Sequence, residues 1–146
     1  MNELGDLYQE MILEHYKSPR NFGVLEDATR AAHGDNPLCG DKIAVTLRMK
    51  GDVIEDLRFK GSGCAISTAS ASLMTEAVKG KTKAQVEALY EKFHPMVMGT
   101  GSREGVGKLE VFSGVSEFPV RVKCATLAWH TLKAALEGKK DPVSTE

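Results

Sequence analysis

Three cysteines and one aspartate, which lie far apart in the chain, constrain the fold more than any other feature of this sequence. They are Cys39 and Asp41 in the segment NPLCGD, Cys64 in GSGCAIS and Cys124 in RVKCATLAW. A zinc site takes four ligands from Cys, His, Asp and Glu, so three thiolates and one carboxylate complete such a shell. Because the spacing lacks the close cysteine pairs of a zinc finger, the fold must bring three distant segments to one place.

Length and composition indicate one ordinary globular domain. The chain has 146 residues, of which 42% are hydrophobic and 27% charged, and its formal net charge is -1. A chain of this length buries roughly 68% of its unfolded surface and needs no disulfides. Since it has neither a basic excess nor a long apolar run, we expect no nucleic acid and no membrane among its partners.

The start of the chain and the cysteines together indicate a reducing compartment. The first twenty residues mix acidic and apolar positions and do not follow the pattern of a secretion signal. We therefore expect a cytoplasmic protein, in which thiols stay reduced and a cysteine cluster binds metal or takes part in catalysis.

The first half of the chain is expected to form a helix and then a hairpin. Apolar residues recur at helical spacing over residues 4–15. Residues 22–39 are rich in Gly, Asn, Asp and Pro, which predicts an irregular loop. Alternating apolar residues predict a strand over 43–49 and a return strand over 53–59, with a bulge or a sheet edge at Glu55.

The second half is expected to be mainly helical. Small residues over 65–78 predict a helix that packs closely on the sheet. A capping box of Thr82 and Gln85 begins a third helix, which we expect to stop at Pro95. The glycine-rich residues 96–107 predict a loop whose role the sequence does not indicate.

The remaining residues complete the predicted architecture. A short helix is favoured over 109–112, and a long closing helix over 120–136 is expected to end at Gly138. The fold class is therefore α+β, with a small antiparallel sheet packed against helices in a single domain of residues 1–138. Residues 139–146 are expected to be a disordered tail.

Cys64 is placed to act as a ligand or a nucleophile. It follows the segment GSG, where a strand is predicted to end and a helix to begin. The N–H groups at the N-terminus of a helix favour a thiolate over a thiol. A buried structural cysteine is the alternative. The segment is not a nucleotide-binding loop, because Ile66 stands where the third glycine is needed.

The other two cysteines have different settings. Gly40 allows a sharp bend between Cys39 and Asp41, and residues two apart at the start of a strand lie on one face. A carboxylate that only caps a turn is the alternative for Asp41. The basic neighbours Arg121 and Lys123 favour the ionised form of Cys124. The alternative role for Cys124 is that of a buried residue in the hydrophobic core.

The histidines are expected to have structural roles, because nothing in their spacing selects one of them as a ligand. They are His15, His33, His94 and His130. A hydrolase with a Cys-His-Asp site is a further alternative, but the sequence shows no local signature of one.

Four segments in order resemble the IscU/SufU family of iron–sulfur cluster assembly proteins over nearly the whole chain. They are YQEMILEHYKSPRNFG, HGDNPLCGD, FKGSGCAIS and FPVRVKCATLAWHTL. In the IscU branch a histidine precedes the third cysteine, and here that position is Lys123. The 59 residues between Cys64 and Cys124 also resemble the insertion of the SufU branch, so the chain is more similar to SufU.

The resemblance implies a zinc ion held by Cys39, Asp41, Cys64 and Cys124. It implies a zinc-dependent sulfurtransferase that accepts persulfide sulfur from a pyridoxal-phosphate cysteine desulfurase of the SufS kind. In the family a desulfurase histidine displaces one cysteine from zinc, which here implies Cys39 as the acceptor, and Arg121 would steady the freed thiolate. A downstream iron–sulfur scaffold or a reductant would then receive the sulfur.

A scaffold that assembles a [2Fe-2S] cluster on the same ligands is the alternative function. Thiolates bind iron as well as zinc, so the ligands alone do not separate the two functions. The absence of a histidine before Cys124 favours zinc.

Overall fold

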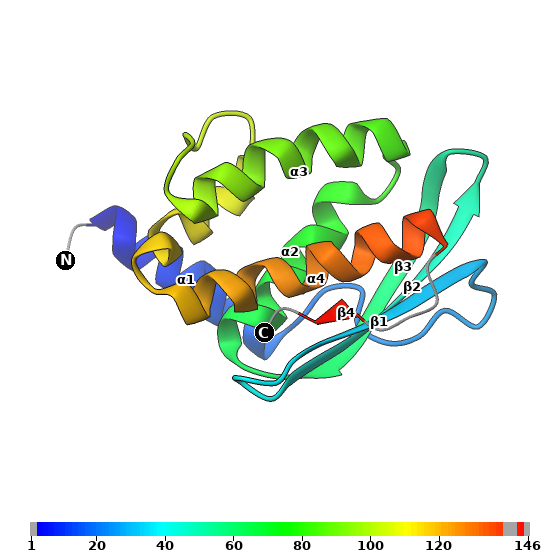
Figure 1. The fold of residues 1–146 in the computed structure, drawn as a ribbon, viewed down its shortest axis with the longest axis horizontal. Helices are drawn as coiled ribbons and strands as arrows, with labels where there is room; N and C mark the ends of the chain where they lie inside the picture. The colour runs from blue at the N-terminus through cyan, green and yellow to red at the C-terminus, as the bar shows by residue number, and fades with distance from the viewer. Residues whose placement is uncertain (1–2, 139–142, 145–146) are drawn as a thin grey trace.

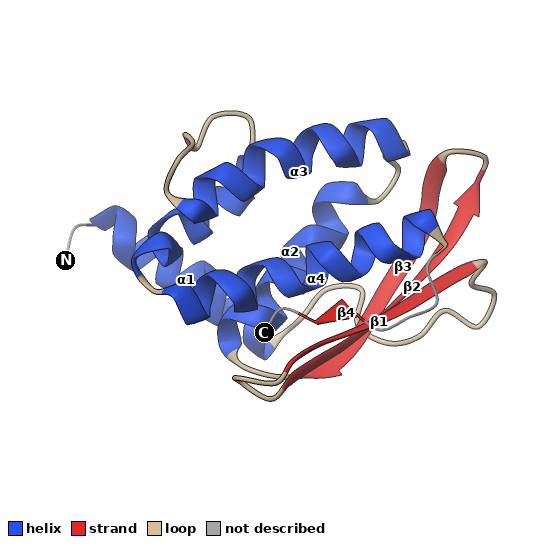
Figure 2. Ribbon diagram, viewed as in Figure 1, coloured by secondary structure: helices blue, strands red, loops and turns tan. Residues whose placement is uncertain are grey.

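Helices cover one face of a small β-sheet in the computed structural model of this protein, which describes residues 3–138 and 143–144 (Figures 1 and 2). The elements in chain order are α1 (Glu3–Lys17), β1 (Arg30–Asn36), β2 (Asp41–Lys50), β3 (Val53–Ser62), α2 (Ala65–Val78), α3 (Lys83–Met98), the 3-10 helix η1 (Gly107–Glu117), α4 (Pro119–Glu137) and β4 (Val143–Ser144).

The sheet has the strand order β3-β2-β1-β4. Strands β1, β2 and β3 are antiparallel neighbours, and the two residues of β4 pair with β1 in parallel. Helix α4 packs on β1 and β2, α2 packs on β3 and α4, and α1 packs on α2. These layers confirm the predicted α+β domain with a small antiparallel sheet.

Strand β1 lies within residues 22–39, so the prediction of an irregular loop there was wrong. Its sequence RAAHGDN carries no large apolar residue, and the local pattern of a strand is therefore absent. The strand forms because α4 covers it closely. A Cβ on Gly34 would lie 2.2 Å from Thr131 Oγ1, so glycine permits this approach.

The predicted irregularity at Glu55 is confirmed. The pairing of β2 with β3 passes from Arg48 opposite Asp56 to Met49 opposite Ile54, which leaves Glu55 as the extra residue of a β-bulge. Arg48 donates to the Glu55 carboxylate at 2.8 Å and so ties the bulge to the neighbouring strand.

Helix α3 begins at the predicted capping box but continues through Pro95 to Met98, so the predicted stop was wrong. Met96 and Val97, which follow the proline, are buried in the core, and their burial offsets the loss of one helical hydrogen bond. The helix ends at Gly99, whose φ of 81° is favourable for glycine. The predicted short helix at 109–112 lies inside η1, and α4 ends at Gly138 as predicted.

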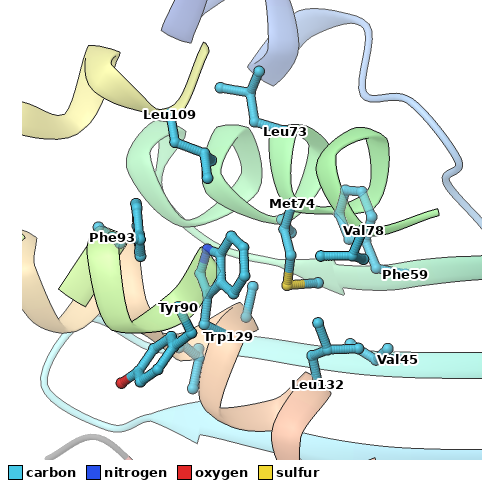
Figure 3. Close-up of a cluster of buried hydrophobic side chains, with 14 of the residues drawn as sticks. Val45, Phe59, Leu73, Met74, Val78, Tyr90, Phe93, Leu109, Trp129 and Leu132 are labelled. Carbon is cyan, nitrogen blue, oxygen red and sulfur yellow. The ribbon is translucent and has the colours of Figure 1, made fainter. Parts of the chain in front are cut away.

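Aromatic side chains from the helices fill the core above the sheet. Figure 3 shows Trp129 of α4 among Tyr90, Phe93 and Met74. The rings of Phe93 and Trp129 are stacked with centroids 5.0 Å apart, and both side chains are fully buried. Small residues of α2 bring that helix close to α4, where Ser70 donates to the Ala125 carbonyl at 2.6 Å. This packing fixes the starts of α2 and α4.

The end of the chain extends the sheet at one point. Val143 and Ser144 form β4, although a disordered tail was expected over 139–146. The other six residues of that tail lie outside the described residues. Across residues 3–138 and 143–144, no helix combines the length and the apolar content that crossing a membrane requires.

His15 ties α1 to α2 through a buried contact. Its Nδ1 lies 2.7 Å from Ser72 Oγ, which also accepts the N–H of Arg20 at 2.8 Å. Ser72 can thus donate its single hydroxyl proton to Nδ1, which must then carry no proton of its own. This favours a neutral ring. The other ring nitrogen, Nε2, lies 3.7 Å from the Glu76 carboxylate. Burial lowers the pKa of His15, as repulsion from Arg20 also does.

We expect the protein to lose stability as the pH falls below about 6.5, the ordinary pKa of histidine in an unfolded chain. The folded state binds fewer protons than the unfolded state there, because the pKa of His15 is lowered in the fold. Urea unfolding from pH 8 to pH 5 in excess chelator should show a shallower loss for His15→Gln than for the parent. The exposed His33, changed to Gln, is the control. An unaltered slope in His15→Gln would show that His15 does not carry this effect.

Candidate metal centre

The predicted ligands meet where three chain segments reach the same end of the sheet (Figure 1). The turn between β1 and β2 carries Cys39, and β2 begins at Asp41. Cys64 lies between β3 and α2, and Cys124 lies in the second turn of α4. The packing of α2 and α4 on the sheet therefore brings distant parts of the sequence together, as the metal hypothesis requires.

The distances within this cluster suit a metal ion. Ligand atoms of Cys39, Asp41 and Cys124 all lie within 4.8 Å of one another. The sulfur atoms of Cys39 and Cys124 are 3.4 Å apart, and the sulfur of Cys64 is 3.7 Å from Asp41 Oδ2. Tetrahedral zinc with bonds of about 2.3 Å to sulfur separates neighbouring ligand atoms by roughly 3.8 Å. The spacing of Cys39, Asp41 and Cys124 thus fits zinc, while Cys64 is not in that group of three and lies against Asp41.

Asp41 is a fully buried carboxylate, with 0% of its surface exposed. Its Oδ1 accepts the N–H of Cys64 at 2.8 Å, and Oδ2 faces the thiol of the same residue. Within the described residues it forms no ion pair with Lys, Arg or His. A buried carboxylate without a cationic partner is costly, and a bound cation would offset that cost.

Gly63 makes room for the Asp41 carboxylate. A Cβ at this position would lie 2.4 Å from Asp41 Oδ1, closer than two such atoms can approach. The glycine before Cys64 therefore has a steric function that neither its motif nor its place in a turn indicates.

Cys64 is the N-cap of α2, and its sulfur accepts the N–H of Ser67 at 3.4 Å. A hydrogen bond from Cys124 lowers the pKa of Cys64 to about 7, and the N–H groups of Ser67 and Ile66 act in the same direction. Burial and the Asp41 carboxylate oppose this shift. The predicted effect of the helix N-terminus on this thiol is thus confirmed in its direction.

For Cys124 the predicted effect of basic neighbours was wrong. Its hydrogen bond to Cys64 and its burial raise the pKa of Cys124, since only 2% of the residue is exposed. The Arg121 side chain is exposed and lies over the ring of Phe118, with its guanidinium carbon 4.3 Å from the ring centroid. Lys123 lies next to Cys124 in the chain but points to another side of the helix, and the Arg121 side chain turns to Phe118, so sequence proximity did not indicate contact.

Asn36 is a member of this cluster that the sequence did not single out. It is fully buried at the end of β1, and its Nδ2 lies 3.9 Å from the sulfur of Cys124. Its Oδ1 accepts the N–H of Leu38 and its carbonyl accepts the N–H of Cys39, both at 3.2 Å. Asn36 therefore shapes the turn that presents Cys39. The Asn-Pro pair at the end of β1 is the sequence signal for such a turn.

Cys39 lies on an exposed turn and is more accessible than Cys124. It is half-buried and stands between Leu38, which is 63% exposed, and Gly40, whose φ is 71°. Cys64 and Cys124 by contrast belong to helix starts that are packed on the sheet. A thiol from another protein can thus approach Cys39 more easily than it can approach Cys124.

The histidines lie outside the cluster. Within the described residues, the group of possible metal ligands contains two cysteines and one aspartate but no histidine. His15 lies between α1 and α2, and His94 and His130 both flank the ring of Tyr90. These places agree with the structural roles expected for them.

Comparison with known proteins gives consistent matches along the chain. Residues 7–141 match the NifU-like N-terminal domain. The zinc-dependent sulfurtransferase SufU of Bacillus subtilis is 45% identical over 132 residues, which are 89% of each chain. The iron–sulfur cluster assembly scaffold protein IscU of Streptococcus pyogenes is 43% identical over 139 residues, covering 94% of this chain and 87% of that one.

A solved structure supports the same assignment of the fold. It is described as a putative iron–sulfur cluster assembly scaffold protein for the SUF system from Fervidobacterium islandicum. Its TM-score is 0.83 at 38% identity, over 87% of this chain and 94% of that one.

Proposed function

The chain belongs to the NifU-like N-terminal domain family, which confirms its resemblance to the IscU and SufU proteins of iron–sulfur cluster assembly, and we propose that it is a zinc-dependent sulfur acceptor. Its partner would be a pyridoxal-phosphate cysteine desulfurase of the SufS kind, and its place the cytoplasm. The observation that carries this proposal is the half-buried Cys39 thiol on an exposed turn, beside the buried ligand groups of Asp41 and Cys124.

Zinc would be held by Cys39, Asp41, Cys64 and Cys124. When bound, zinc would keep these thiols ionised at neutral pH. The relative named a zinc-dependent sulfurtransferase is 45% identical to this chain, which supports zinc as the metal. The ligand spacing supports Cys39, Asp41 and Cys124, and the contact of Cys64 with Asp41 supports the fourth ligand.

Sulfur transfer would begin when the Cys39 thiolate attacks the outer sulfur of a persulfide on the desulfurase. A new sulfur–sulfur bond then forms on Cys39, the bond within the donor persulfide breaks, and the desulfurase cysteine leaves as a thiolate. Leu38 and Gly40 flank the attacking thiol in a turn that a partner can reach. A later acceptor, either a scaffold or a reductant, would take the sulfur from Cys39.

The second candidate is a scaffold that builds a [2Fe-2S] cluster on the same residues. The IscU relative at 43% identity is named a scaffold, and thiolate ligands suit iron. Lys123 precedes Cys124 and supplies no further imidazole ligand, which favours the sulfur acceptor.

Desulfurase turnover tests the sulfur-acceptor proposal directly. Alanine and sulfide release by a SufS-type desulfurase should be measured with cysteine and a reductant, with and without this protein. We expect turnover to rise severalfold as the protein is added, and to saturate near one chain per desulfurase subunit. Turnover that does not respond to the protein would contradict the proposal.

Metal analysis separates the two candidates. We expect about one zinc per chain in the purified protein, and a lower melting temperature after chelation, because closing three segments on one ion couples binding to folding. Elemental analysis and a visible spectrum measure this. Stoichiometric iron with a charge-transfer spectrum and no zinc would favour the scaffold.

A further inference from the structure

A cleft beside α4 takes no part in the cysteine cluster. It has a volume of about 500 Å³ and lies between the end of α3, the end of η1, residues 119–130 of α4 and β4. Small-molecule sites commonly have volumes of about 300–1,000 Å³. The cleft is thus large enough for a small organic ligand.

Three nitrogen-bearing side chains line this cleft and lack polar partners. They are His94 from α3 and both Lys123 and His130 from α4. The two imidazoles contact the Tyr90 ring, with centroids 5.4 Å and 5.9 Å away. Within the described part of the chain, none of the three makes a hydrogen bond or an ion pair through its side chain. Nearby Lys133, by contrast, pairs with Glu87 at 3.3 Å.

The charge of the cleft bears on the kind of ligand it could take. Among the residues that the structure describes, no Asp or Glu lines it. Burial lowers the pKa of His130, and repulsion from His94 and Lys133 adds to the shift. An anion bound here would accept hydrogen bonds from the imidazoles and the ammonium group, and it would offset the repulsion that lowers the pKa of His130.

Apolar side chains form the rest of the lining. Met98 of α3 and Val122 of α4 lie on the cleft, together with the ring of Pro119. About half of the Met98 surface is exposed, which leaves it available to an apolar group. A ligand that fits both parts has an acidic head and an apolar body.

We propose that this cleft binds a small organic anion. Its carboxylate or phosphate head is held by His94, His130 and Lys123, and its apolar body lies against Met98 and Val122. The proposal is independent of sulfur transfer, because the cysteine cluster is not part of the cleft.

Ligand titration of the full zinc-loaded chain tests this proposal by NMR of the histidine ring protons. The probes are benzoate, phenyl phosphate and benzamide, the last being a neutral analogue of benzoate. Both anions should shift the His94 and His130 signals in a saturable way while the His33 signal stays unchanged. Benzamide should bind at least about tenfold more weakly, because a hydrogen bond to a charged group is the stronger kind. The tighter of the two anions identifies the preferred head group.

Two variants and a matched control complete the experiment. His94→Gln and His130→Gln should each weaken binding of the preferred anion by about tenfold. His33→Gln, on the exposed surface of β1, should bind it as the parent does. The proposal is overturned if neither anion gives a saturable shift in the parent, or if benzamide binds as tightly as benzoate. Unchanged affinity in both cleft variants would overturn it as well.

Discussion

Cys39→Ser should abolish persulfide acceptance and the stimulation of a cysteine desulfurase, while the protein stays folded and keeps part of its zinc. A serine hydroxyl is not ionised near neutral pH and does not replace a thiolate as a nucleophile. The loss should reach at least about a hundredfold in sulfur transfer, since Cys39 supplies the attacking atom in the proposed step. Asp41, Cys64 and Cys124 remain to hold the metal.

Cys64→Ser and Cys124→Ser are the informative comparisons for this prediction. Cys64 caps α2, and Cys124 is buried in α4, so loss of either should lower metal content and melting temperature more than Cys39→Ser does. Peptide mass spectrometry after incubation with desulfurase and cysteine should place the added sulfur on the Cys39 peptide. A persulfide on Cys124, with transfer intact in Cys39→Ser, would show that the acceptor has been assigned to the wrong cysteine.

The sequence predicts those features that local chemistry decides. The capping box of Thr82 and Gln85 begins α3, because both reciprocal hydrogen bonds join residues three apart. The bulge at Glu55 follows from a charged residue that interrupts an alternating strand. The cluster of Cys39, Asp41 and Cys124 was also predictable, because three scattered cysteines and a nearby aspartate match the donor set of a metal site.

The features that the sequence does not predict depend on contacts between distant segments. Strand β1 has little strand propensity of its own, and α4 and β2 determine its conformation. Pro95 remains inside α3 because the residues after it are buried. The pKa of Cys124 rises through burial and through Cys64, which lies sixty residues earlier in the chain. The contributions of Asn36 and Gly63 to the site are also unpredictable from the sequence. Asn36 contacts Cys124, and Gly63 contacts Asp41, only after the three segments meet.

Gly63→Ala, a substitution outside the ligands, is expected to lower the zinc affinity strongly. The added methyl group would lie 2.4 Å from Asp41 Oδ1, so the carboxylate must move and lose the N–H of Cys64. Zinc affinity should fall by about 10–100-fold, as it does when groups that orient a ligand are removed from other metal sites. A competition titration with a chromophoric chelator measures the affinity directly, and the melting temperature of the zinc-loaded protein should fall with it.

Gly114→Ala is the matched control for this last prediction. An added Cβ there meets no atom within 4 Å, and Gly114 is not among the glycines with a positive φ. The control should therefore bind zinc as the parent does. Asp41→Ala removes the displaced carboxylate altogether, so adding Gly63→Ala to it should cause little further loss, because the methyl group no longer meets an oxygen. If instead the two substitutions weaken zinc binding additively, Gly63 acts on the site by a route other than the Asp41 carboxylate.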